Sequence, residues 1–110
     1  MNDTLPPRAS FRTVNSILCK AGFKAGKHHT GWNSERQCND ATSGFWTHPN
    51  GKIVYVCTDT LPFGGNTAYL RLAESEKDYV GKRNHHVSTK SGLFREALYI
   101  AEHADFETMY

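Results

Sequence analysis

Two β-rich stretches joined by an asparagine–glycine turn constrain the fold of this chain more than any other feature. Residues 44–48 and 53–58 are rich in aromatic and β-branched side chains, which favour strands. Asn50-Gly51 lies between them, and both positions tolerate the positive φ angles of a tight hairpin turn. Because the second stretch carries apolar side chains on both faces, we expect it to be a central strand of a sheet.

Two further segments have the apolar spacing of amphipathic helices. The first follows Ser10, a residue type that caps helices, and ends before Gly22, so we predict a helix over residues 11–21. The second follows Ser91, which we take as its N-cap, and its apolar stripe reaches residue 104. Residues 106–110 then alternate apolar and polar, which predicts a C-terminal strand.

The remaining segments give weaker signals. Residues 1–9 hold two prolines and little that could pack, so we predict a flexible N-terminal arm before a single domain over residues 10–110. Residues 23–27 alternate like a short strand, whereas residues 28–41 and 81–91 are polar and predict exposed loops. Residues 67–80 fit either a strand or a helix, and we slightly favour a strand followed by a charged loop.

Together these elements predict a small single α+β domain. The expected order is helix, strand, hairpin, insertion, helix, strand, with a sheet of about four mostly antiparallel strands and two helices packed on one face. The length of 110 residues suits one domain, and the longest apolar run is too short to span a bilayer. Three cysteines, an odd number, and the lack of a signal-peptide pattern favour a cytoplasmic protein. We expect Cys19 and Cys57 to be buried.

A helix ending in Ala21-Gly22-Phe23, followed by a Gly-Phe strand and a closing helix, resembles small orphan α+β proteins of bacteriophages that infect actinobacteria. Residues 18–24, 44–56 and 93–106 carry this resemblance. The segment 61–90 departs from the pattern as a long insertion. The resemblance implies a fold, but it implies no activity and no functional residue.

Histidines and cysteines supply candidate reactive groups. His28, His29 and Cys38 could form a small metal or thiol site, which we keep as a third functional alternative. Zinc needs about four ligands, and neighbouring residues of a strand point to opposite faces, so a histidine pair offers one ligand. The spacings of zinc sites, phosphate loops and nucleophile elbows are missing from the sequence. We therefore predict no bound metal, no cofactor and no enzymatic activity.

The distribution of charge gives the strongest functional signal. The formal net charge of +2 hides an uneven pattern, because residues 4–34 contain basic residues and no acidic one. Lys82, Arg83 and Lys90 form a second basic stretch. Such a face can bind phosphate groups or an acidic protein surface.

Trp32 and Phe63 lie in predicted loops, where an aromatic side chain can anchor a contact. Because the basic excess is small, we expect a non-enzymatic protein that binds and modulates a protein partner. The expected contact residues are Trp32, Phe63, Lys27, Lys82 and Arg83. The alternative is a nucleic-acid-binding module that uses Lys20, Lys24, Lys27, Lys82, Arg83 and Lys90. We predict no membrane partner, and the sequence leaves the oligomeric state open.

Overall fold

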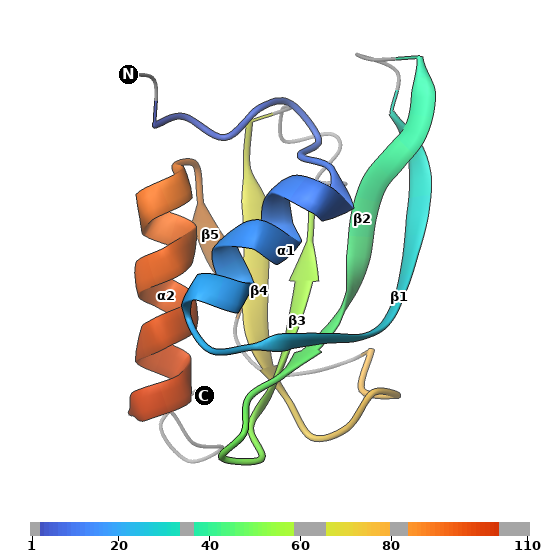
Figure 1. The fold of residues 1–110 in the computed structure, drawn as a ribbon. Helices are drawn as coiled ribbons and strands as arrows, with labels where there is room; N and C mark the ends of the chain where they lie inside the picture. Colours follow the sequence, from blue (N-terminus) through green and yellow to red (C-terminus); the bar gives the residue numbers. More distant parts are fainter. Residues whose placement is uncertain (1–2, 34–36, 59–65, 80–83, 104–110) are drawn as a thin grey trace.

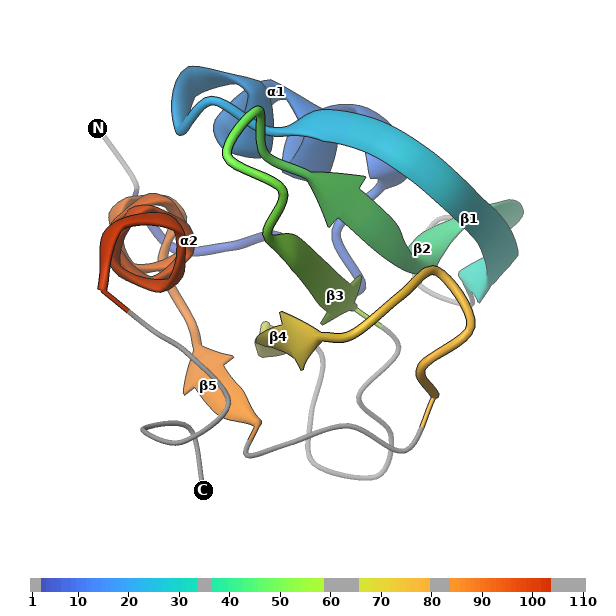
Figure 2. The same cartoon turned by 90° about the horizontal axis from the view of Figure 1, so that it is seen from below.

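The computed structural model describes residues 3–33, 37–58, 66–79 and 84–103, and within them the fold is α+β (Figure 1). Helices α1 (Phe11–Lys20) and α2 (Lys90–Glu102) cover one face of an antiparallel sheet, as Figure 2 shows from below. Among the described residues, five strands form this sheet in the order of the chain. They are β1 (Lys24–Asn33), β2 (Cys38–Thr47), β3 (Ile53–Cys57), β4 (Ala68–Ala73) and β5 (His85–Val87). The predicted fold class is confirmed.

The predicted hairpin forms the centre of the sheet. β2 and β3 are antiparallel, with Phe45 opposite Tyr55, and Gly51 takes a φ of 94° in the turn between them. β3 lies between β2 and β4, so the prediction of a central strand is confirmed. Val54 and Val56 point toward the helices.

The main core lies between the helices and the sheet. Trp46 is fully buried there, and its indole nitrogen donates to Asn15 Oδ1 of α1 at 3.0 Å, so the one polar atom of the ring is satisfied. Burying an aliphatic core side chain stabilises the fold by about 1.5–3 kcal/mol. The large aliphatic side chains that are fully buried in this core are Leu5, Val14, Leu18, Val54, Val56, Leu70, Leu93 and Ile100.

The sheet is larger than predicted, because two segments that the sequence indicates as loops contain strands. The predicted loop over residues 28–41 is wrong, since β1 continues to Asn33 and β2 begins at Cys38. Polar side chains there face solvent, and the backbone hydrogen bonds of the ladder do not depend on an apolar pattern. β5 forms within the predicted loop over residues 81–91, where Val87 pairs with Ala68 of β4. The ambiguous segment 67–80 contains β4 followed by a loop, as favoured above.

The helix starts were predicted with mixed success. Ser10 caps α1, and its side chain accepts from Thr13 N at 3.3 Å. The cap of α2 is Thr89 instead of Ser91, because Thr89 Oγ1 accepts from Gly92 N at 2.9 Å. The predicted strand over residues 106–110 lies outside the described residues.

Residues 3–9 pack against the domain, which differs from the expectation of a loose arm over residues 1–9. Leu5 and Ala9 lie in the main core, and Leu5 N donates to Ser88 O at 2.9 Å. Arg8 is also buried and donates from Nη1 to Trp32 O at 3.0 Å. A lone leucine between polar residues and prolines has no periodicity, so the sequence carries no local signal of this packing.

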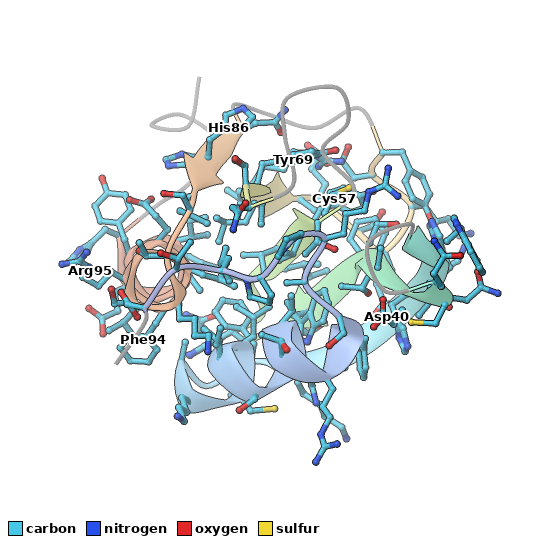
Figure 3. All side chains as sticks on the ribbon, turned by 90° about the horizontal axis from the view of Figure 1, so that it is seen from above. Asp40, Cys57, Tyr69, His86, Phe94 and Arg95 are labelled. Carbon is cyan, nitrogen blue, oxygen red and sulfur yellow. The ribbon has the colours of Figure 1, made fainter. Side chains whose placement is uncertain are left out.

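The face of the sheet opposite the helices, which we call the open face, carries a smaller core. Phe45, Tyr55, Cys57 and Ala73 are buried there. Figure 3 shows Cys57 and Tyr69 on the side of the sheet away from α1. Burial raises the pKa of the Tyr69 hydroxyl. The same effect, with burial again the largest cause, raises the pKa of Tyr55.

Residues 74–79 form a loop that packs on this open face. The ring of Tyr79 meets that of Phe45 edge to face, with 5.3 Å between their centres. Arg71 of β4 fixes the loop, because its Nη2 donates to Asp78 O at 2.6 Å. In the described part of the chain, neither helix is long and apolar enough to cross a membrane.

Candidate functional site

A groove of about 580 Å³ lies between α1 and the first turn of α2. Arg12, Ser16 and Lys20 line it from α1, and their spacing of four residues places them on one face of that helix. Lys90 and Phe94 line it from α2. We call this feature the α1–α2 groove; its other lining residues are Asp3, Thr13, Ile17 and Ser91.

Among the described residues, three cations converge on this groove, and none of them pairs with a described carboxylate. Arg12, Lys20 and Lys90, which we call the groove cations, are all exposed. Within the part of the chain that the structure describes, none of them forms an ion pair. Their positive charges therefore add along the groove, and they make it attractive to an anion.

Two of the groove cations lie where a helix disfavours them. Arg12 is in the first turn of α1 and Lys90 begins α2, while neither first turn contains an acidic residue. The positive end of the helix dipole repels a cation at these positions and would attract an anion. Lys20, in the last turn of α1, is favourably placed. Departures from the local rules of stability are typical of functional positions.

Of the carboxylates that the structure describes, that of Asp3 lines the groove, and it forms hydrogen bonds with α2. Asp3 accepts from Ser91 N at 3.2 Å through Oδ1 and from Ser91 Oγ through Oδ2. The backbone oxygen of Asp3 accepts from Lys90 N at 2.7 Å. The first turn of α2 can therefore hold a carboxylate with its backbone and side-chain donors.

Apolar and hydroxyl groups complete the groove. Ile17 is buried and Phe94 is partly buried, so they form an apolar floor between the cations. Figure 3 shows Phe94 on the side of α2 that turns toward the layer of α1, whereas Arg95 points away from it. Thr13 and Ser16 add hydroxyl groups that can donate or accept hydrogen bonds.

Of the contact residues expected for a protein partner, the two that the structure describes do not line this groove. Trp32 and Lys27 both lie on β1 and are exposed, and Trp32, at 53% exposure, belongs to a strand instead of the predicted loop. Phe63, Lys82 and Arg83 lie outside the described residues.

The described residues among those expected for a nucleic-acid partner divide between two places, while Lys82 and Arg83 lie outside the described ranges. Lys20 and Lys90 line the α1–α2 groove. Lys24 and Lys27 are exposed on β1. Arg8, which belongs to the acid-free stretch, is only 6% exposed and adds nothing to the basic surface.

The structure does not bring the predicted metal or thiol residues together. The β1–β2 register places His28 opposite Gly44 and Cys38 opposite Asn33. His28 and Asn33 are five residues apart on one strand, a separation of about 16 Å. Among the described residues, no group of three or more His, Cys, Asp or Glu side chains could hold a metal ion.

The histidines and cysteines have other surroundings. His29 Nε2 lies 2.7 Å from Ser43 Oγ, within hydrogen-bond distance. The His28 ring stacks on Phe11, with 4.1 Å between the ring centres. Cys57 is buried as predicted, but the prediction for Cys19 is wrong, because that side chain is exposed on α1.

Comparisons of this chain with protein-family models, with curated proteins and with solved structures find no match. The function is therefore argued from the groove. Of its lining residues, the sequence-based prediction missed Arg12, Phe94 and Asp3 as site residues. Arg12, a cation in the first turn of the first predicted helix, was a signal that could have pointed to the groove. Lys90 gave no such signal, because it precedes Ser91, the residue predicted to cap the second helix.

Proposed function

We propose that this protein is a non-enzymatic interaction protein that binds an acidic segment of a protein partner in the α1–α2 groove. The observation that carries the proposal is the convergence of Arg12, Lys20 and Lys90 on one groove without a carboxylate partner among the described residues. A bound acidic segment would supply the negative charge that the first turn of α1 lacks.

The floor of the groove favours a peptide over a phosphodiester chain. Ile17 and Phe94 can bury an apolar side chain of the partner, which adds a contribution that a sugar–phosphate backbone cannot make. The hydroxyls of Thr13 and Ser16 can donate to peptide carbonyl groups.

The spacing of the cations indicates the pattern of the partner. Arg12 and Lys20 are eight residues apart on α1, a distance of about 12 Å along the helix. Four residues of an extended chain span about 13 Å. We therefore expect a segment with two acidic residues four positions apart and an apolar residue between them.

A second candidate function is nucleic-acid binding. It is supported by Lys24 and Lys27, which are exposed on β1 and extend the basic surface beyond the groove. This reading predicts affinity that falls steeply with salt, because each phosphate contact releases counterions.

Fluorescence anisotropy can test the proposal. The probe is a labelled ten-residue peptide with Glu at positions 3 and 7 and Leu at position 5, compared with the same peptide carrying Gln in place of Glu. We expect the Glu peptide to bind with a micromolar dissociation constant, as small transient interfaces do, and the Gln peptide to bind much more weakly. Lys90→Ala should weaken binding about tenfold, which corresponds to the loss of one good charged contact.

The matched control is Lys77→Ala, which removes an exposed lysine of the loop over residues 74–79 and should leave binding unchanged. Tighter binding of single-stranded DNA or double-stranded RNA, with a steep dependence on salt, would favour the second candidate. If neither the peptide nor a nucleic acid binds at low salt, both candidates fail.

A further inference from the structure

The Asp3 carboxylate lies at the positively charged start of α2, inside the groove that we assign to the partner. It is exposed, and its two oxygens accept from the backbone and the side chain of Ser91. Asp3 and Ser91 are 88 residues apart in the sequence, so the fold and not the local chain brings this anion to the groove.

We propose that Asp3 is a built-in competitor: its carboxylate occupies the place that a carboxylate of the partner takes when the partner binds. This inference rests on the proposed function. It adds that the partner group bound at the start of α2 is the carboxylate of an Asp or Glu side chain. When the partner binds, the Asp3 carboxylate leaves Ser91, and a carboxylate of the partner accepts the same two hydrogen bonds from Ser91 N and Oγ.

The carboxylate is not needed to hold the N-terminal segment in place. Leu5 is buried in the main core, and its backbone nitrogen donates to Ser88 O at 2.9 Å. Thr4 pairs with Thr89, and the backbone oxygen of Asp3 still accepts from Lys90 N. The side chain of Asp3 can therefore leave Ser91 while the backbone of residues 3–5 stays where it is.

The carboxylate is also not the cap of α2. Thr89 already accepts from Gly92 N, so the helix keeps its N-cap when Asp3 moves. The net effect of Asp3 is to lower the positive potential of the groove and to fill one of its anion positions. Both effects weaken the apparent affinity for an acidic partner, since the binding-competent state is only partly populated.

The test compares wild type with Asp3→Asn in the anisotropy experiment with the Glu peptide. Asparagine keeps an oxygen that can accept from Ser91 N, so the variant removes the charge and preserves the shape. We expect the variant to bind the Glu peptide about three to ten times more tightly. Glu74→Gln is the matched control, because it makes the same change of net charge on the loop over residues 74–79; it should change the affinity by less than about twofold.

A second measurement follows the amide resonance of Ser91 in wild type during the peptide titration. Exchange of one carboxylate for another predicts that this resonance shifts and saturates together with the anisotropy. If wild type binds the peptide but Asp3→Asn binds equally or more weakly, the competitor role is refuted and the proposed function stands. If wild type and Asp3→Asn both fail to bind, the proposed function itself is refuted.

Discussion

The two sides of the sheet hold their cations in opposite ways. On the open face, Arg71 is only 3% exposed; its guanidinium lies 4.6 Å from the centre of the Tyr55 ring and donates to Asp78 O. On the helix side, the three groove cations are exposed and have no ion pair among the described residues.

This difference separates a structural cation from cations available for binding. A buried charge is tolerated only where rings, carbonyls or carboxylates compensate for its lost hydration. An exposed cation at the start of a helix has no such role, and it makes the helix less stable. Whether a cation already has contacts within the protein, more than its positive charge alone, therefore indicates which surface binds another molecule.

The largest expected effect is on the open face. Arg71→Ala should lower the free energy of unfolding by about 2–3 kcal/mol, because it removes a buried charged hydrogen bond and leaves Asp78 O without this donor. Urea denaturation followed by circular dichroism measures the change. Binding of the Glu peptide by the folded fraction should not change. A loss of binding would contradict the view that Arg71 is structural and that only the groove cations bind the partner.

The second prediction concerns alkaline pH. The folded-state pKa of Tyr69 is raised above its ordinary value of 10.0, chiefly by burial, so the folded state favours the neutral phenol. The stabilisation is complete below the unfolded-state pKa and is lost as the pH rises above it, because only the unfolded chain ionises readily. Urea denaturation at pH 8 and pH 11 should show this loss, and Tyr69→Phe should make it smaller. An equal loss in wild type and variant would exclude Tyr69 as its source.

The third prediction concerns the helix side. Lys90→Gln should stabilise the fold by about 0.3 kcal/mol, because it removes a cation from the first turn of α2 without adding a second carboxylate beside Asp3. The same change should weaken binding of the Glu peptide about tenfold. Thermal unfolding and anisotropy measure the two effects, and unchanged affinity in the variant would show that Lys90 does not contact the partner.

The smallest expected effect concerns Trp32, whose side chain is exposed and lies outside both cores. Trp32→Ser should change the free energy of unfolding by less than about 0.5 kcal/mol, as substitutions of exposed side chains do. It should also leave peptide binding unchanged, because Trp32 does not line the α1–α2 groove. Weaker binding would extend the interface to β1, where the sequence first indicated a contact.

The sequence alone determined the elements whose signals are local. The Asn50-Gly51 turn and its flanking β-branched residues predicted the β2–β3 hairpin, and the spacing of Val14, Ile17 and Leu18 predicted α1. In both cases residues close together in the sequence determine the element. The turn forms because its residues tolerate positive φ angles, and the helix forms because its apolar side chains share one face.

Only the tertiary structure decided the features that join distant residues. Backbone pairing extends β1 and β2 through polar positions beyond their patterned parts, and β5 is defined by its partner β4. No side-chain pattern marks these two extensions or β5. Likewise, the first turn of α2 is remote in the chain from Asp3 and α1, and the groove exists because the core packs both helices on one face of the sheet. Charge counts along a sequence cannot show which cations converge, since convergence depends on packing.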